Sequence, residues 1–106
     1  MKEQLHPVGN EIIFENDVIR VWLVDVAPGD SLPLHHHLRP YLLVNLTDGR
    51  LSVESPQGPP AERTLEAGAV EWHDSGELHS FQNQGGERYR NVLVELKSGV
   101  DPATEE

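Results

Sequence analysis

The chain has 106 residues, with 18 acidic and 8 basic side chains that give a formal net charge of −10 at pH 7. This length suits one domain, and the negative charge opposes binding to nucleic acid or to an anionic membrane surface. Because the sequence contains no cysteine, disulfides, thiolate metal sites and a cysteine nucleophile are excluded, and histidine, carboxylate and tyrosine remain as metal ligands.

Polar segments with glycine and proline stand at both ends of the sequence. We expect residues 1–10 to form an N-terminal tail and residues 98–106 an acidic C-terminal tail, with one domain over residues 11–97 between them. The sequence starts without a basic-then-apolar signal pattern, and its apolar stretches are shorter than the roughly 18 residues of a membrane span. A cytoplasmic protein is therefore expected.

Short alternating or β-branched segments, separated by glycine and proline turns, predict about eight strands. Turn signals recur at a spacing of roughly 8–12 residues, which is typical of an all-β sandwich or barrel. The predicted strands are residues 11–15, 18–26, 41–47, 50–55, 62–66, 69–73, 78–83 and 89–97. Since no segment shows a helical period, the sequence predicts an all-β fold.

The predicted last strand, 89–97, alternates between an apolar and a more polar face. The apolar face holds Val92, Val94 and Leu96, and the other holds Asn91, Glu95 and Lys97. This alternation predicts a strand whose apolar face covers the core.

Three consecutive histidines, His35, His36 and His37, follow the turn at residues 28–29, and His79 lies further along the chain. Alternate residues of a strand share one face, so His35 and His37 can bind one metal ion while His36 points away. A histidine from elsewhere in the chain would complete a three-imidazole site. The pattern predicts metal ligation by His35 and His37.

The two histidine segments resemble the two sequence motifs of the cupin superfamily. The first motif is matched by Gly29, His35, His37 and Gly49, and the second by Gly68, Gly76, His79 and Asn83. The spacing fits throughout, but Leu42 stands where the family usually has a glutamate ligand and Asp74 where it has a proline. The resemblance spans residues 18–97. Within the superfamily, the sequence is similar to the small single-domain bacterial cupins of the group named for the β-alanine degradation protein.

The resemblance implies a cupin-type double-stranded β-helix, a jelly-roll barrel in which two antiparallel sheets enclose a cavity. It also implies a site made of His35, His37 and His79 for a divalent transition metal, whether iron, manganese, zinc, nickel or copper. Cupins commonly pair through terminal strands, so a homodimer is expected.

Three neutral imidazoles leave the double charge of a divalent ion uncompensated, which makes it a stronger Lewis acid and anion-binding centre. Its open positions would accept water, a small anionic substrate or dioxygen. We therefore expect an iron-type dioxygenase or related enzyme acting on a small oxygenated or carboxylated metabolite. The alternatives are a non-catalytic cupin that binds a metal or a small ligand, and a decayed site in which the histidines only pack.

Further residues are candidates for supporting roles around this site. Tyr41 is the candidate hydrogen-bonding acid and Arg20 the candidate anion clamp. The candidates for the cavity wall are Trp22, Trp72 and Phe81, and those for a replacement of the missing carboxylate ligand are Glu77, Glu71, Asp74 and Tyr41. His73 and His6 fit neither motif and are interpreted as exposed.

Overall fold

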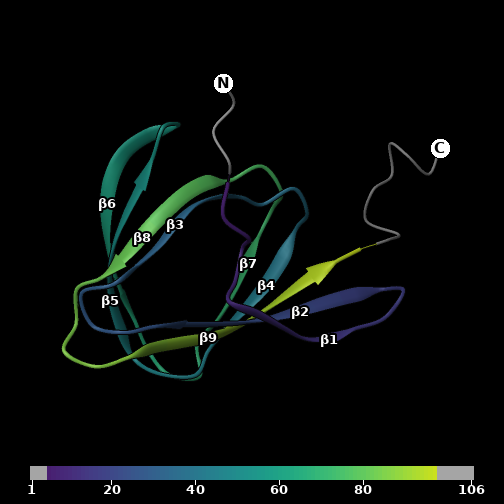
Figure 1. The fold of residues 1–106 in the computed structure, drawn as a ribbon, viewed down its shortest axis with the longest axis horizontal. Helices are drawn as coiled ribbons and strands as arrows, with labels where there is room; N and C mark the ends of the chain where they lie inside the picture. The colour runs from purple at the N-terminus through teal and green to yellow at the C-terminus, as the bar shows by residue number, and fades with distance from the viewer. Residues whose placement is uncertain (1–4, 98–106) are drawn as a thin grey trace.

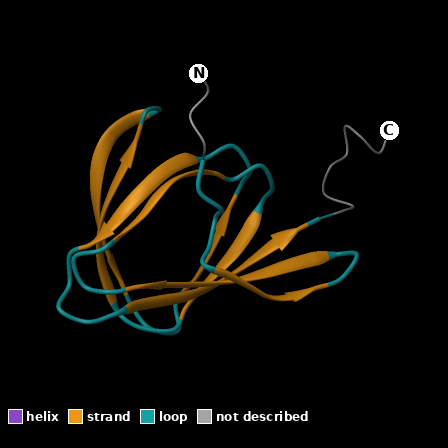
Figure 2. Ribbon diagram, viewed as in Figure 1, coloured by secondary structure: helices purple, strands orange, loops and turns teal. Residues whose placement is uncertain are grey.

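The structure, a computed structural model, describes residues 5–97, which form nine strands. The strands are β1 (Glu11–Glu15), β2 (Ile19–Val26), β3 (Ser31–His36), β4 (Tyr41–Asn45), β5 (Gly49–Ser55), β6 (Gly58–Leu65), β7 (Val70–His73), β8 (Leu78–Asn83) and β9 (Tyr89–Leu96). Strands and loops account for all of the described chain (Figure 2), so the all-β prediction is confirmed. A search of these residues finds no helix that could span a membrane.

The strands form two antiparallel sheets that face each other around an interior (Figure 1). The five-stranded sheet has the order β1-β2-β9-β4-β7 and the four-stranded sheet the order β3-β8-β5-β6. Sequence neighbours such as β3 and β4 lie in different sheets, so the chain crosses repeatedly from one sheet to the other. This arrangement is the jelly-roll barrel that the sequence predicted.

Prolines account for the two strands that the sequence pattern missed or shortened. The segment that becomes β3 contains Pro33, which falls at a β-bulge where the register shifts between Leu32 and His35. β6 was predicted to begin at residue 62, but it begins at Gly58 and includes Pro59 and Pro60. β6 is the edge strand of its sheet, and strands tolerate proline at edges and at bulges because no ladder hydrogen bond is lost there.

The inward face of β9 is the opposite of the one that its sequence pattern predicted. Tyr89, Asn91, Leu93 and Glu95 are buried, whereas the intervening Val92, Val94 and Leu96 are only half-buried. Burying polar groups is tolerated when they are hydrogen-bonded. Asn91 Nδ2 donates to Tyr89 Oη at 2.9 Å, and Glu95 Oε1 accepts from Trp22 Nε1 at 2.8 Å. These bonds allow β9 to bring polar side chains into the barrel.

Residues 5–10, expected as part of a tail, pack against the barrel. The His6 N–H donates to the Leu34 carbonyl at 2.9 Å, and Val8 is buried in a cluster with Tyr41 and Leu93. This segment therefore contributes to the barrel core. Residues 1–4 and the predicted acidic tail 98–106 lie outside the described residues.

Candidate metal centre

The bulged strand β3 and its neighbour β8 bring three histidines together. His35 and His79 are direct cross-strand partners, and His37 lies two residues beyond His35 on the same face. Backbone hydrogen bonds hold His37 in place: its N–H donates to the Glu77 carbonyl at 2.8 Å, and its carbonyl accepts from the Gly76 N–H at 2.7 Å. Gly76 has a φ of 113°, a conformation that side-chain-bearing residues rarely adopt, so this turn depends on glycine.

The three imidazoles converge inside the barrel. One potential ligand atom from each of His35, His37 and His79 lies within 4.8 Å of the others, and the ring centroids are 4.6 to 5.0 Å apart. His35 and His37 are each only 1% exposed. His36 belongs to a separate surface hollow. The sequence prediction that the three histidines gather on one face, with His36 turned away, is confirmed.

The protonation states of the three histidines suit a divalent transition metal. Burial lowers the pKa of His35 to about 4 and that of His37 to about 3, and it also lowers the pKa of His79. His35 Nδ1 donates to the Pro33 carbonyl at 2.8 Å, which leaves Nε2 with its lone pair free. His37 Nδ1 is buried with no hydrogen-bond partner in the described chain. Neutral imidazoles with free nitrogens are the form that binds metal, so these residues fit such an ion.

Tyr41, and not Leu42, faces the histidines from the opposite sheet. Tyr41 and Leu43 both line the cavity that contains the histidines, and Leu42 between them does not. At the strand segment where the sequence matched Leu42 to the family's glutamate ligand, the side chain that faces the histidines is therefore Tyr41. The Tyr41 ring stacks on His37 at a centroid distance of 4.2 Å and on His73 at 4.8 Å. Its hydroxyl donates to Glu77 Oε1 at 2.5 Å.

A network of charged side chains continues outward from Tyr41. His73 contacts Glu77 Oε2 through Nδ1 at 3.0 Å and Glu71 Oε1 through Nε2 at 2.9 Å. Arg63 donates to both oxygens of Glu71, at 3.2 and 2.6 Å. We call Glu71, His73, Glu77 and Arg63 the carboxylate network. It lies on β6, on β7 and in the turn before β8.

Hydrogen bonding sets the charges in the carboxylate network. The hydrogen bond to Glu77 raises the pKa of His73, and the one from Arg63 lowers the pKa of Glu71. Burial alone would raise the pKa of Glu77, but hydrogen bonds to His73 and Tyr41 outweigh it and lower this pKa to about 2. Burial raises the pKa of Tyr41 far above its usual value, so the hydroxyl keeps its proton. The two carboxylates thus hold the pKa of His73 above its usual value.

None of the carboxylates proposed to replace the missing ligand joins the histidine group. Within residues 5–97 this group consists of the three histidines. Glu71 and Glu77 are occupied in the carboxylate network, and Asp74 Oδ1 accepts from Trp72 Nε1 at 3.0 Å. The interpretation of His73 as an exposed residue is wrong, because it is stacked on Tyr41 and paired with both glutamates. Two flanking glutamates within four residues were the signal that could have identified it.

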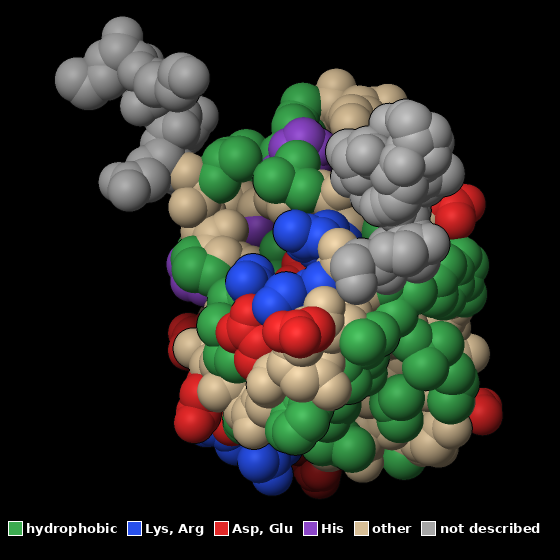
Figure 3. All heavy atoms as spheres, turned by 90° about the vertical axis from the view of Figure 1, so that its right-hand side faces the viewer, with side chains coloured by type: hydrophobic (Ala, Val, Ile, Leu, Met, Phe, Trp, Pro, Cys, Tyr) green, Lys and Arg blue, Asp and Glu red, His purple; other side chains and the backbone are tan. Residues whose placement is uncertain are grey.

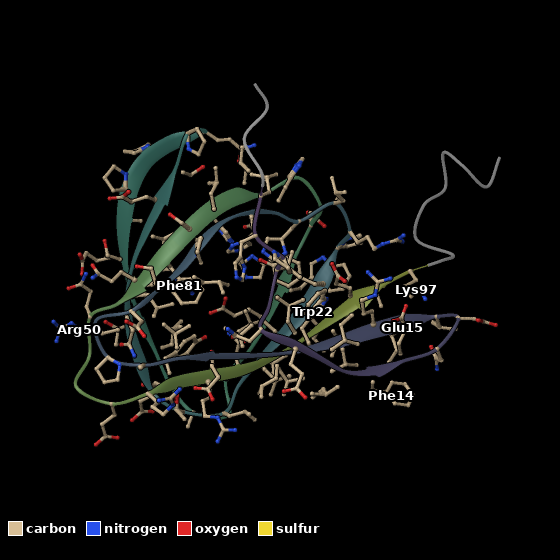
Figure 4. The ribbon with its side chains drawn as sticks, in the orientation of Figure 1. Phe14, Glu15, Trp22, Arg50, Phe81 and Lys97 are labelled. Atoms are coloured by element: carbon tan, nitrogen blue, oxygen red, sulfur yellow. The ribbon has the colours of Figure 1, made fainter. Side chains whose placement is uncertain are left out.

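Arg20 lies away from the histidines. Its guanidinium pairs with Glu15 at 3.0 Å and approaches Glu95 at 3.9 Å, and Lys97 also reaches Glu15, at 2.7 Å. Glu15 and Lys97 lie side by side at the outer end of the β1–β2 hairpin (Figure 4). In this structure Arg20 belongs to a surface ion-pair group, and it is not one of the residues that line the histidine cavity.

The histidine cavity is small and mainly apolar. Its volume is about 50 Å³, well below the roughly 300–1,000 Å³ of pockets for drug-sized ligands. Phe81 projects into the interior from β8 and lines it (Figure 4). Trp22 packs on the neighbouring core cluster, and Trp72 is 53% exposed, so of the three aromatic residues considered for the wall only Phe81 lines it. The cavity suits a small molecule.

An antiparallel barrel with three converging histidines, two of them buried and His79 half-buried, fits a metal-binding cupin. No model of a known protein family matches the chain. The curated β-alanine degradation protein BauB of Pseudomonas aeruginosa is 34% identical over 71 residues, which cover 67% of this chain and 74% of BauB. The chain therefore belongs to the cupin superfamily, as a small single-domain cupin similar to BauB.

Solved structures agree on the fold. A cupin domain from Bordetella pertussis superposes with a TM-score of 0.79 at 23% identity, covering 92% of this chain and 100% of that chain. A protein with a double-stranded β-helix domain from Klebsiella pneumoniae gives 0.66 at 20% identity, over 91% and 85% of the two chains. The polyketide cyclase RemF of Streptomyces resistomycificus gives 0.63 at 20% identity, over 92% and 81%. These likenesses establish the double-stranded β-helix.

Proposed function

We propose that this protein is a metal-dependent enzyme of the dioxygenase type that acts on a small oxygenated or carboxylated metabolite, with His35, His37 and His79 as metal ligands. The observation that carries the proposal is the convergence of three imidazoles, two buried and one half-buried, within 4.8 Å in a small cavity. Packing alone does not explain this arrangement, because it leaves His37 Nδ1 buried without a partner among residues 5–97.

The side chains around the histidines would bind and orient an anionic substrate. Arg63 and His73 line the cavity, and no aspartate or glutamate among residues 5–97 does, so the lining favours an anion over a cation. Tyr41 keeps its proton, and its hydroxyl could donate to a substrate oxygen next to His37 if it turned away from Glu77. The apolar residues of the wall exclude water around the substrate.

A divalent ion held by the three histidines would polarise a substrate oxygen and, if it is iron, would supply redox chemistry with dioxygen. In a dioxygenase reaction both oxygen atoms enter the product, so no external reductant is needed. The protein's own contribution is to keep the three imidazoles unprotonated and to hold the proton of Tyr41 at the cavity wall. To act as a hydrogen-bonding acid, Tyr41 would turn its single O–H from Glu77 Oε1, to which it donates in this structure, towards the substrate.

Oxygen consumption by the iron(II)-loaded protein tests the enzymatic proposal. Small enols, diols and carboxylated amino-acid derivatives serve as candidate substrates. We expect at least one to drive oxygen uptake well above the His79→Ala background, while the His36→Ala control keeps the wild-type rate because His36 is outside the cavity. If every candidate leaves uptake at the His79→Ala level although iron is bound, the enzymatic proposal fails.

The second candidate is a non-catalytic cupin that binds a metal or a small ligand. It is favoured by the absence of a carboxylate from the histidine group within residues 5–97, since non-haem iron oxygenases typically use two histidines and one carboxylate. Thermal denaturation of the metal-loaded protein with the same compounds separates the two candidates. A ligand that raises the Tm without oxygen uptake or product supports the binding protein.

We further propose that two copies pair through β1. All five residues of this edge strand are exposed, including Ile12, Ile13 and Phe14 at 44%, 47% and 52%. Phe14 points away from the barrel (Figure 4), and hydrophobic side chains gather beside the basic and acidic ones on the face in Figure 3. An exposed apolar edge strand favours pairing with another chain. Light scattering should give a dimer for the wild type and a monomer for Phe14→Ser; a monomeric wild type would contradict this.

A further inference from the structure

The histidine cavity is too small to hold a metabolite beside a metal ion. Its volume is about 50 Å³, enough for a few water molecules. A larger hollow of about 310 Å³ lies at the surface, and this volume is close to the lower end of the range for small-molecule pockets. Of residues 5–97, Val8 is the one that lines both spaces. The Val8 side chain therefore stands between the histidine cavity and the surface hollow.

Residues 5–10 bridge the two sheets, descending from the four-stranded sheet to β2 before β1 begins (Figure 1). The His6 N–H donates to the Leu34 carbonyl of β3, and the Asn10 N–H donates to the Leu23 carbonyl of β2, each at 2.9 Å. A segment tied by backbone bonds near its ends separates from a barrel at a smaller cost in free energy than a strand held by a full ladder. We therefore expect this segment to open before the strands do.

Val8 is the part of this segment that faces the histidine site. It is 7% exposed and packs with Tyr41 and Leu93, and the Tyr41 ring stacks on His37. Since Val8 is held by apolar contacts, it can move without leaving a buried polar group unpaired. Its outward movement would join the hollow to the cavity and open a path to the Tyr41 and His37 rings.

The charges that line the hollow suit an acid. Arg20 and Arg39 line it, against Glu95 as the one acidic lining residue among residues 5–97. Arg20 is already paired with Glu15. Arg39 donates from Nη1 to the Lys97 carbonyl at 2.6 Å, which uses one of the five N–H donors of a guanidinium. Because a guanidinium matches the geometry of a carboxylate, Arg39 is the residue expected to bind an acid here.

We propose that the surface hollow is the outer part of the ligand site, where Arg39 binds the carboxylate of a small acid, and that residues 5–10 form a gate whose opening at Val8 joins the hollow to the histidine cavity. The ligand class is a small carboxylic acid with an oxygen-bearing group that reaches inwards to the histidines. This inner position of the ligand rests on the proposed function. Arg39 is then a specificity-determining residue outside the histidine cavity.

Labelling of introduced thiols tests the gate in the metal-free protein, because the sequence contains no cysteine of its own. Val8→Cys places a thiol at the gate. Val24→Cys is the matched control, since Val24 also lines the histidine cavity but belongs to β2 and is 1% exposed. With rates corrected for the stability of each variant, carboxyethyl methanethiosulfonate should modify Val8→Cys about tenfold faster or more, by local opening. Equal rates overturn the gate.

The charge of the labelling reagent tests Arg39. Aminoethyl methanethiosulfonate has a similar size and the opposite charge, so the ratio of the two rates at Val8→Cys measures the electrostatic preference of the entry path. Arg39→Gln should lower the carboxyethyl-to-aminoethyl ratio by about threefold or more. Arg50→Gln is the control, because Arg50 lines a different hollow and lies away from Trp22 (Figure 4). An unchanged ratio in Arg39→Gln, or an equal fall in Arg50→Gln, overturns the role of Arg39.

Hydrogen exchange on the unmutated protein keeps the gate testable if Val8→Cys does not fold. The Asn10 and His37 N–H groups both donate to backbone carbonyls. Asn10 should exchange through a local opening that depends little on denaturant, and His37 only with global unfolding; one shared opening free energy for both overturns the gate. None of these measurements needs a metal. A working gate in a protein that takes up no oxygen contradicts the enzymatic proposal alone, and oxygen uptake without a gate contradicts this inference alone.

Discussion

The barrel contains two polar regions with opposite chemistry. From β3, the residue after it and β8 come three imidazoles with lowered pKa values, two of them buried and that of His79 half-buried. From β6, β7 and the turn before β8 comes the carboxylate network, in which every charge has a partner. Nitrogen lone pairs that accept no hydrogen bond remain available to bind a metal ion. Nearby carboxylates that are already paired with cations are not free to become ligands.

Removing one imidazole should give the largest effect. His37→Ala takes away one of three ligands, so the affinity for zinc or iron should fall by more than the roughly 10–100-fold that follows loss of an outer-shell partner. Elemental analysis and competition with a chelator measure the change. His36→Ala, one residue away on the outer side of the strand, is the matched control and should retain the metal. Equal metal content in the two variants would contradict the contrast between the histidine site and the carboxylate network.

The pH dependence of stability should have opposite signs for the histidine site and for His73 of the carboxylate network. His35 and His37 have lowered pKa values, about 4 and about 3, so their contribution to metal-free stability is complete above pH 6.5 and is lost as the pH falls towards those values. Each costs roughly 1.4 kcal/mol per pH unit over that range. His73 has a raised pKa, so its contribution is complete below pH 6.5 and is lost as the pH rises through the folded value.

Histidine ring signals in NMR spectra of the metal-free protein check this directly. The signals of His35 and His37 should stay in the neutral form down to about pH 4, and the His73 signal should be the last to lose its proton as the pH rises. A common titration near pH 6.5 for all three would show that the histidine site and the carboxylate network do not differ in this respect.

Tyr41→Phe should have a smaller effect that sharpens the boundary between the two regions. The variant keeps the ring that stacks on His37 and His73 and removes the donor to Glu77. We expect about 1 kcal/mol lower stability by denaturant titration, with metal content unchanged. Loss of metal in this variant would indicate that the Tyr41 hydroxyl is a metal ligand and that it belongs to the histidine site.

The smallest effect is expected at the outer edge of the carboxylate network. Glu71→Gln removes the ion pair with Arg63, whose side chains are 23% and 38% exposed, so less than about 1 kcal/mol of stability should be lost. The His73 pKa should fall because one of its two carboxylate partners is gone. Glu62→Gln, an exposed residue on the same strand as Arg63, is the control and should leave the His73 signal in place. An unchanged His73 pKa in Glu71→Gln would contradict this account of the network.

The sequence predicted the strands and the three histidines because both depend on spacing. Alternation and turn residues identify strands, and the motif intervals bring His79 to the pair on β3. The motif frame matched Leu42 to the glutamate position, but Tyr41 is the side chain that lines the cavity, because neighbouring residues of a strand face opposite sides. Motif spacing alone does not determine which of the two residues faces inward.

The remaining errors concern polar residues that are buried through pairing. Asn91 and Glu95 were taken for a polar outer face, and His73 for an exposed side chain, because composition alone favours those choices. Their burial depends on partners supplied by other strands, such as Trp22 for Glu95. Two asparagines in otherwise apolar strands, at 45 and 91, were the available signal, since asparagine is disfavoured in strand interiors.

The β-bulge at Pro33 determines which residues of the histidine run face the interior of the barrel. In β3 three steps lead from Leu32 to His35 while two lead from Phe81 to His79 on β8, so the extra residue decides which member of the run enters the barrel. In a regular strand with the same residues, Leu32 would share its face with His36, which would turn inward in place of its two neighbours. A graft of this segment into another scaffold must therefore preserve the bulge as strictly as the histidines themselves.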